Sequence, residues 1–302
     1  MELLLHWYPG HMAKATRELK ARLRLVDAVL EVIDARIPES SRHPAPFAAE
    51  RPLTRVILLG RADLADPELT KAWIRHFHGQ GLPAVAADLR RTNWVTQVRR
   101  LLAPKPGLAQ SPLPARPAPG GGVSGRRSVR AMVVGLPNVG KSTAINALVG
   151  RAKAGTGARA GVTRRVQWLA AGDGLELLDS PGLLWPEAIR GQRALWLAAA
   201  GLVPDDAFDA QAVAGLFLTE LARCCPERLA ARYRLELPAT ARPVAEDDHD
   251  DQPTSILAAV ALRTGCRLPG GRLDLDRAAA IVLQDFRAGR LGRMTLEEPP
   301  GG

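Results

Sequence analysis

A glycine-rich segment in the middle of the chain constrains the fold more than any other feature. Residues 135–142 read Gly-Leu-Pro-Asn-Val-Gly-Lys-Ser, after the apolar strand pattern of Val129–Val134 and before a helix predicted from Lys141 to about Val149. The spacing matches the GxxxxGK(S/T) phosphate loop, which requires a strand before it and a helix after it. In such a loop, backbone N–H groups and the helix dipole converge on phosphate oxygens. The segment therefore predicts an α/β domain that binds a nucleoside triphosphate, the alternative being an ordinary glycine turn.

Two side chains of this loop have separate predicted roles. Lys141 is expected to reach the β- and γ-phosphates as a point charge, and the Ser142 hydroxyl is expected to ligate Mg²⁺. Arginine would fit poorly at position 141, and the chain uses 35 arginines but only six lysines, so a lysine there favours a functional loop. Phosphate contacts are predicted for Gly135, Pro137, Asn138, Val139, Gly140, Lys141, Ser142 and Thr143.

A second phosphate-related motif follows about forty residues later. Asp179-Ser-Pro-Gly182 ends the strand predicted at Leu175–Leu178 and matches the DxxG pattern. In that pattern the aspartate holds Mg²⁺ through water and the glycine N–H meets the γ-phosphate. Between the two motifs, Thr163 is the candidate for a threonine that closes over Mg²⁺ and the γ-phosphate. The alternatives are Thr156 in that role, or an ordinary loop threonine at position 163.

The base-reading motif is expected upstream of the phosphate loop. GTPases usually read guanine with Asn-Lys-x-Asp, and no such sequence follows Asp179. Strand Val56–Leu59, however, runs into Gly60-Arg61-Ala-Asp63, with the aspartate in fourth position. Asp63 can accept from two guanine N–H groups, and Arg61 can stack on the base. Gly60 lacks the polar contact of asparagine, so guanine selectivity is expected to fall; a loop aspartate with no ligand is the alternative. This order of motifs is a circular permutation.

Strand and helix patterns alternate along the first third of the chain. Strands are predicted at 27–34, 54–59 and 82–87, and helices at 66–77 and 92–102. This alternation favours a mostly parallel sheet with helices on both faces. Residues 104–127, rich in proline and glycine, predict a linker within the same domain. After residue 203 the sequence becomes helical, so we expect an α/β domain over 1–203 and a small all-α domain over 204–302.

Five segments together resemble the ribosome biogenesis GTPase A family, and they follow one another in the order of that family. They are His6–Ala15, Asp34–Arg42, Gly135–Ser142, Leu178–Pro186 and Pro226–Leu229. The resemblance covers nearly the whole chain and implies a circularly permuted P-loop GTPase domain with a helical C-terminal domain. It also implies a role in late assembly of the large ribosomal subunit, contact with rRNA, and hydrolysis stimulated by the ribosome. Two departures concern base recognition: Gly60-Arg61 replaces Asn-Lys, and Val85–Arg90 contains no clean Ser-Ala-like segment.

The water-orienting glutamine of Ras-like enzymes has no counterpart after Gly182, where Leu183 and Leu184 stand. Slow intrinsic hydrolysis is therefore expected. The resemblance points to His11 as the catalytic histidine, because imidazole can orient water or donate to developing charge; a structural or RNA-facing histidine is the alternative. The resemblance also points to Asn138 as the ligand of an activating K⁺, the alternative being an asparagine that tolerates turn geometry.

The charge balance favours a polyanionic partner. Lys and Arg number 41 against 31 Asp and Glu, a net charge of +10, although a coding bias toward arginine would also raise it. The basic helix predicted at Met12–Leu25 and the helical C-terminal domain are the expected RNA-facing surfaces, solvated helix faces being the alternative. The acidic run Glu246–Asp251 is expected to be a solvated loop.

The remaining composition excludes several classes of protein. No apolar run approaches the roughly 18–20 residues of a membrane span, the longest being Ala194–Val203. Cys224, Cys225 and Cys266 form no CxxC pair, which argues against a disulfide framework and a zinc site. We expect a cytoplasmic, monomeric GTPase switch that binds GTP and GDP. The competing hypothesis is an rRNA-binding scaffold with weak guanine selectivity and vestigial hydrolysis.

Overall fold

The computed structural model describes residues 4–5, 21–43, 53–103, 128–150, 167–172, 174–179, 189–235 and 252–300. These residues divide into two compact units. An α/β unit contains the described residues from 21 to 179 and the C-terminal residues 295–300. A helical unit contains Leu4–Leu5 and the described residues from 189 to 294. This division differs from the expected boundary after residue 203 at three places, residues 4–5, residues 189–203 and residues 295–300.

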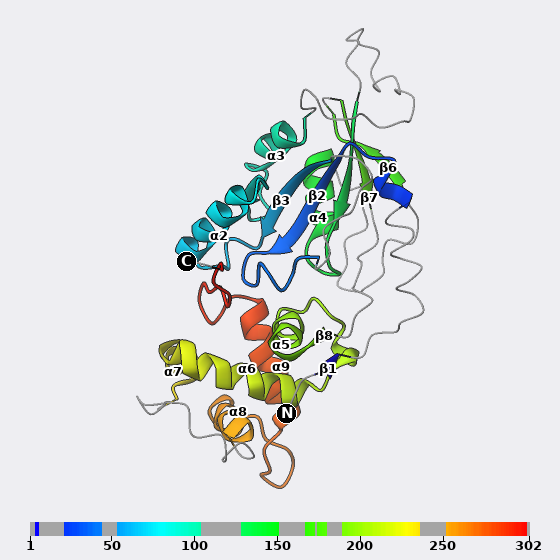
Figure 1. Ribbon diagram of the computed structural model, residues 1–302. Helices are drawn as coiled ribbons and strands as arrows, with labels where there is room; N and C mark the ends of the chain where they lie inside the picture. The colour runs from blue at the N-terminus through cyan, green and yellow to red at the C-terminus, as the bar shows by residue number, and fades with distance from the viewer. Residues whose placement is uncertain are drawn as a thin grey trace. The chain divides into compact units, whose positions relative to one another are not determined.

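The α/β unit contains a six-stranded sheet in the order β4-β3-β2-β5-β7-β6 (Figure 1). The strands are β2 (Ala28–Asp34), β3 (Thr54–Gly60), β4 (Ala84–Ala86), β5 (Val129–Val134), β6 (Gln167–Ala170) and β7 (Leu175–Asp179). All neighbours pair in parallel except β6, which is antiparallel to β7. Strand β2 lies between β3 and β5, so a strand from the first part of the chain pairs directly with the strand that leads into the glycine-rich segment. This arrangement confirms the mostly parallel, permuted sheet.

Helix α2 (Pro67–Gly79) shows how local sequence sets an element of this unit. The Asp66 side chain accepts hydrogen bonds from the backbone N–H groups of Glu68 and Leu69 at 2.8 and 2.9 Å, and Pro67 occupies the first turn. These are strong helix-start signals. Trp73 and Phe77, four residues apart on the buried face, pack into an apolar cluster with sheet residues that include Ile33, Ile57 and Leu59. Helices α3 (Val95–Leu102) and α4 (Lys141–Val149) also contact the sheet.

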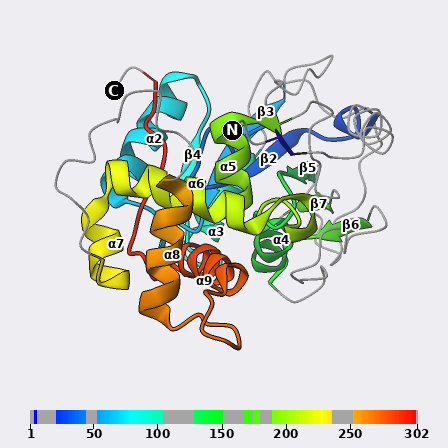
Figure 2. The ribbon, with the colours of Figure 1, turned by 90° about the horizontal axis from the view of Figure 1, so that it is seen from below.

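The helical unit is built around α6. Its helices are α5 (Gly191–Ala199), α6 (Ala210–Cys224), α7 (Pro226–Tyr233), α8 (Gln252–Thr264) and α9 (Leu275–Arg287), with a short 3₁₀ turn at Asp205–Ala207. Helix α6 contacts the other four helices (Figure 2). In the core, Phe217 of α6 packs on Phe286 of α9, with ring centroids 4.9 Å apart, and on Trp196 of α5. Because α5 shares this core, the helical unit begins before residue 204.

Two further features of the helical unit bear on the expectations from sequence. Strands β1 (Leu4–Leu5) and β8 (Ile189–Arg190) form a two-stranded antiparallel ribbon, so the unit is not entirely helical. Among the described residues, no helix combines the length and apolar character that a bilayer crossing would require.

The C-terminal residues belong to the α/β unit. The Thr295 hydroxyl accepts from the backbone N–H of Asp66 and donates to the carbonyl of Ala35, both at 3.1 Å. The indole N–H of Trp73 donates to the Glu297 carbonyl at 2.9 Å. The Glu297 carboxylate accepts from the backbone of Ser40 and of its neighbour Glu39. The tail therefore ties the segment after β2 to helix α2, although at least 224 residues separate the partners of each hydrogen bond.

Candidate functional site

The glycine-rich segment forms a turn that only glycine permits at its first position. Gly135 follows β5 with φ +148°, and a Cβ there would collide with the Val32 carbonyl oxygen of β2. Gly140 precedes α4 in a left-handed conformation, with φ +109°. The absent side chains let the backbone pass close to the sheet and then enter the helix, which is the geometry that exposes N–H groups to phosphate.

The lysine of the segment is held inside the turn. Lys141 begins α4, its side chain is buried, and its ammonium group donates to the Leu136 carbonyl at 2.7 Å. Ser142 and Thr143 follow in the first helical turn and are partly buried. A buried cation beside helix N-terminal N–H groups favours a bound polyanion.

Strand β7 ends in an aspartate at the same edge of the sheet. Asp179, the last residue of β7, pairs with Val133 of β5, two residues before Gly135. The neighbouring parallel strands therefore end together, and Asp179 lies at the edge from which the glycine-rich turn departs. A serine hydroxyl at the start of α4 and a carboxylate at this edge are the hard oxygen donors that Mg²⁺ prefers, so the residues present fit such an ion.

A buried ion cluster lies at the end of β2. Asp34 is fully buried, and its carboxylate accepts from Arg36 at 2.8 and 3.0 Å and from Arg61 at 2.6 Å. Burial raises the pKa of Asp34, but the charges of Arg36 and Arg61 and the hydrogen bonds from Arg36 outweigh it and hold this pKa well below its usual value. Asp34 is therefore an anion at neutral pH and fixes the position of Arg61.

Arg61 connects this cluster to the glycine-rich turn. Its second guanidinium nitrogen donates to the Asn138 carbonyl at 2.8 Å. Arg61 and Asn138 both adopt left-handed backbone conformations, with φ +57° and +56°. We expected Arg61 to stack on a base; in the structure its guanidinium binds Asp34 and the Asn138 carbonyl. The observed role of Arg61 is thus to hold the loop after β3 against the turn.

Leu89 occupies the space beside the two glycines Gly60 and Gly140. A Cβ at Gly60 would lie 2.9 Å from Leu89 Cδ1, and a Cβ at Gly140 would lie 2.7 Å from the same atom. Leu89 itself is 7% exposed, so it is an apolar filler and not a surface side chain. The absence of a side chain at position 60 is therefore coupled to the presence of leucine at position 89.

Asp63, the fourth residue of the loop after β3, carries an arginine partner. Arg90 donates to Asp63 at 2.7 Å, and it also donates two hydrogen bonds to the Asp88 carboxylate. The hydrogen bonds from Arg90 lower the pKa of Asp88. Arg90 is 74% exposed, so this arginine can leave Asp63 at small cost. A hollow of about 330 Å³ lies beside Asp63, lined by residues of the loops after β3 and β4 and by Trp94. Its volume falls within the range of small-ligand sites.

The structure brings together some of the predicted site residues and leaves others outside its description. Gly135 to Thr143, Arg61 and Asp63 lie on adjoining loops at one edge of the sheet, with Asp179 at the end of β7. His11, Thr163, its alternative Thr156, and Gly182 lie outside the described residues. Of the predicted helix at Met12–Leu25, only the part from residue 21 is described.

Three residues of this region were missed from sequence. The sequence signal for Asp34 and Arg36 was an aspartate at the carboxyl end of a strand with an arginine two positions later. This signal is weak, because it indicates a charge cluster only once Arg61 is known to lie nearby. Leu89 had no local signal, because its role depends on Gly60 and Gly140, which are distant in sequence.

Comparison with known proteins identifies relatives over nearly the whole length. The family described as "50S ribosome-binding GTPase" matches residues 130–206. The chain is 37% identical over 300 residues to "Ribosome biogenesis GTPase A" of Priestia megaterium, covering 98% of each chain. Two solved structures of YlqF, one bound to GDP and one from Thermotoga maritima bound to GNP, each have a TM-score of 0.63 and 25% identity. They cover 94% and 95% of this chain and 99% of their own.

Proposed function

The chain belongs to the Ribosome biogenesis GTPase A family, and on this premise we propose that it acts late in assembly of the large ribosomal subunit, which stimulates its hydrolysis. The protein is a GTP-hydrolysing P-loop enzyme that takes part in ribosome biogenesis and cycles between GTP and GDP. The finer assignments below, of subunit, partner and residue, are our proposal.

One observation carries the proposal: the loop expected to read the base is joined to the loop expected to hold the phosphates. Arg61 donates to the Asn138 carbonyl, and Leu89 lies against both Gly60 and Gly140. The residues that contact the base and those that contact the phosphates would therefore be held at a fixed separation before a nucleotide binds. Less conformational entropy of the two loops is then lost on binding.

The phosphates are assigned to the glycine-rich turn. Lys141 neutralises the β- and γ-phosphates, the backbone N–H groups of residues 135–143 surround them, and Gly182 contributes an N–H to the γ-phosphate. Ser142, Thr163 and Asp179 would hold Mg²⁺, with the oxygen donors that this ion prefers. When bound, Mg²⁺ neutralises the charge that develops on the transferred phosphoryl group.

Guanine recognition is assigned to Asp63. Its carboxylate accepts from the two guanine N–H groups that adenine does not present in this arrangement. Arg90 is the present partner of Asp63, so base binding exchanges one cation contact for two hydrogen bonds. Arg61 supports the loop and does not read the base. Because position 60 offers no side chain, we expect GTP to be preferred over ATP by less than in an enzyme with the full Asn-Lys-x-Asp motif.

Hydrolysis is assigned to His11, which would orient the attacking water or donate to developing charge. Asn138 is the proposed K⁺ ligand, which would take the place of an arginine finger. The left-handed conformation of Asn138 favours the alternative, in which asparagine is used because it tolerates this turn. The dependence of the hydrolysis rate on K⁺ against Na⁺ decides between these two roles.

Ribosome contact is assigned to the basic segment Met12–Leu25, predicted from sequence to be helical, and to the helical unit. That unit offers Arg223 on α6, Arg228 and Arg232 on α7, and Arg234 at the end of α7. We propose that the protein acts as a cytoplasmic monomer on rRNA of the large subunit or of its precursor. Arginine suits this partner because its planar fork binds phosphate in two-point contacts.

The test is nucleotide hydrolysis by the full chain with and without large ribosomal subunits, for GTP and ATP separately. We expect a slow rate alone, a marked increase with subunits, and a preference for GTP. Lys141→Ala is expected to abolish nucleotide binding, whereas His11→Ala keeps binding and slows only the stimulated rate. An unchanged stimulated rate in His11→Ala would remove His11 from the mechanism.

The second candidate function is an rRNA-binding scaffold with vestigial hydrolysis. The observation that favours it is the replacement of asparagine by Gly60, with Leu89 filling the space. The same assay separates the two functions: subunit binding without any increase in phosphate release, and equal displacement of labelled GDP by GTP and ATP, would support the scaffold.

A further inference from the structure

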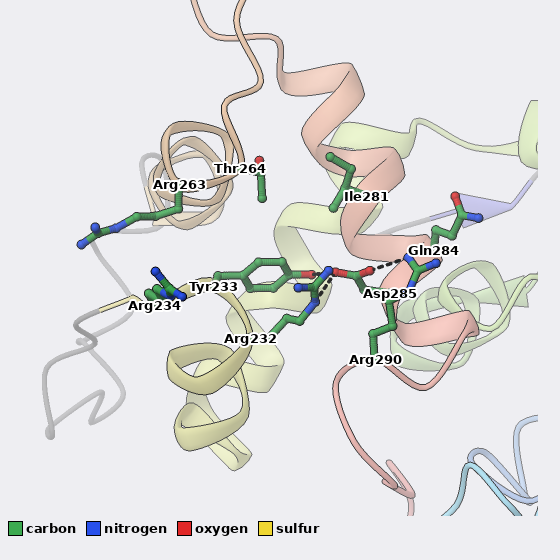
Figure 3. A pocket seen from close by; sticks show the side chains of 9 residues that line it. All are labelled: Arg232, Tyr233, Arg234, Arg263, Thr264, Ile281, Gln284, Asp285 and Arg290. Carbon is green, nitrogen blue, oxygen red and sulfur yellow. Dashed lines mark hydrogen bonds and ion pairs between the residues drawn. The ribbon is translucent and has the colours of Figure 1, made fainter.

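A basic pocket lies in the helical unit, and none of its lining residues belongs to the proposed nucleotide site. Its volume is about 480 Å³, and the ends of α7 and α8 and the C-terminal half of α9 form its walls (Figure 3). Of the residues that the structure describes, four arginines line it, Arg232, Arg234, Arg263 and Arg290, against one carboxylate, Asp285. Four cations and one anion in a single pocket leave a strong excess of positive charge, which selects an anionic occupant.

Asp285 organises one side of this pocket. Its carboxylate is fully buried and accepts from Arg232 at 2.8 Å, from Arg290 at 2.9 Å and from the Tyr233 hydroxyl at 3.1 Å. Burial raises the pKa of Asp285, but the hydrogen bonds from Arg232, Arg290 and Tyr233 outweigh it, so this pKa is lowered and Asp285 is an anion at neutral pH. One buried carboxylate therefore fixes two guanidinium groups, both of which keep part of their surface in solvent.

Arg234 and Arg263 lie on the side of the pocket away from Asp285 (Figure 3). Arg234 ends α7 in a left-handed conformation, with φ +56°, and Arg263 lies in the last turn of α8. Both side chains are exposed, and within the described part of the chain neither forms an ion pair. Two arginines are thus preorganised by Asp285, and two more present their charge to solvent.

The basic surface continues beyond this pocket. Arg232 and Arg290 also line an adjoining hollow, together with Arg228, whose guanidinium donates to the Leu291 carbonyl. The resulting row contains five arginines, against the carboxylates of Asp285 and Glu227. A row of cations along a surface matches a ligand with repeated negative charges better than it matches a single small anion.

Among the described residues that line this pocket, no aromatic ring is open to a ligand. Tyr233 is only 3% exposed, and its hydroxyl is committed to Asp285, so a base cannot stack on this ring. Recognition of single-stranded RNA by sequence usually uses exposed aromatic faces on which splayed bases stack. In the absence of exposed aromatic faces, the guanidinium groups contact phosphate oxygens. Such contacts position the RNA on the protein but do not distinguish one base sequence from another.

We propose that Arg234, Arg263, Arg232 and Arg290 bind the phosphodiester backbone of RNA, with no selection of base sequence. This inference rests on the proposed function and specifies which surface of the helical unit meets the ribosomal RNA. Arg234 and Arg263 contact phosphate directly, while Asp285 is a positioning residue that aims Arg232 and Arg290.

The experiment uses the full chain and two fluorescein-labelled RNAs of 20 nucleotides, one polyuridine and one of mixed unstructured sequence. The variant is Arg234→Gln with Arg263→Gln, and the matched control is Arg267→Gln with Arg272→Gln, two exposed arginines of the same unit outside the pocket. Affinity is measured by anisotropy from 50 to 200 mM salt. Thermal unfolding and unstimulated GTP hydrolysis of both variants establish that the fold and the nucleotide site are intact.

Loss of two phosphate contacts is expected to reduce the slope of log K against log salt by about 1.4, since single strands give about 0.7 per contact. At 0.1 M salt this corresponds to a loss of affinity of about 25-fold. The loss is expected to be equal for both RNAs, and the control is expected to bind like the wild type.

The outcomes separate this inference from the proposed function. If the wild type binds RNA and large subunits but the pocket variant binds equally well, the pocket inference is wrong and the proposed function stands. If the variant loses subunits while it keeps both RNAs, the partner at this pocket is a protein and the inference is also overturned. If the wild type binds neither RNA nor subunits, the proposed function itself fails.

Discussion

Restoring asparagine at position 60 is expected to destabilise the protein, although asparagine is the usual residue of the guanine-reading motif. The Cβ of the new side chain would lie 2.9 Å from Leu89 Cδ1 and 3.4 Å from Leu89 Cγ. Carbon atoms attract one another at about 3.5–4.0 Å and repel below it, so Leu89 must move or the end of β3 must shift. Overpacking of this kind costs about 1–3 kcal/mol.

The reciprocal change tests the same contact from the other side. Leu89→Ala removes a nearly buried side chain and is expected to cost about 2–3 kcal/mol, the low end for leucine truncation, because Leu89 keeps some exposure. In the double variant Gly60→Asn/Leu89→Ala, the new side chain enters the space that leucine left. The combined loss is therefore expected to be smaller than the sum of the single losses by about 1–2 kcal/mol.

The assay is urea unfolding of the full chain, followed by tryptophan fluorescence and circular dichroism, with midpoints and slopes compared. Gly79→Asn is the matched control, because a Cβ at Gly79 meets nothing within 4 Å, and it should change stability by less than about 0.5 kcal/mol. Additivity of the two substitutions within about 0.5 kcal/mol would refute the reasoning, since independent sites behave that way. The ratio of GTP to ATP affinity should rise only in the double variant.

Two further predictions concern the charged groups around the same loops. Asp34→Asn should lower the free energy of unfolding by about 3–5 kcal/mol at pH 7, because it removes the buried carboxylate that forms an ion pair with the Arg36 guanidinium. Since the pKa of Asp34 is lowered in the folded protein, its contribution is full above the unfolded-state pKa and is lost as the pH falls below about 4. Urea unfolding across pH 3–7 should show the difference from wild type shrinking in acid; a constant difference would contradict it. Arg90→Ala should strengthen GDP binding by no more than about fivefold, because the exposed pair with Asp63 is weak. Competition with a fluorescent GDP analogue measures this, and weaker binding would mean that Arg90 supports the site.

The sequence motifs predicted a nucleotide site but did not describe how its loops are joined. Asn138 and Arg61 were both identified from motifs, and each was expected to act on a ligand. In the structure they act on each other, because the loop after β3 and the turn after β5 meet at the edge of the sheet. The order of the strands brings these two loops together, since β3 and β5 are parallel and only β2 lies between them in the sheet.

The sequence alone determined the elements whose causes are local. Gly135 and Gly140 mark the turn, Asp66 and Pro67 start α2, and alternating apolar segments predict a parallel sheet, because backbone dihedral angles and side-chain periodicity act over a few residues. Only the tertiary structure decided the rest.

In the structure Leu89 packs against Gly60, the Glu297 carboxylate accepts from the backbone of Ser40, and Asp285 forms ion pairs with Arg232 and Arg290. The topology of the chain brings these residues together, and short-range sequence patterns do not predict such long-range contacts.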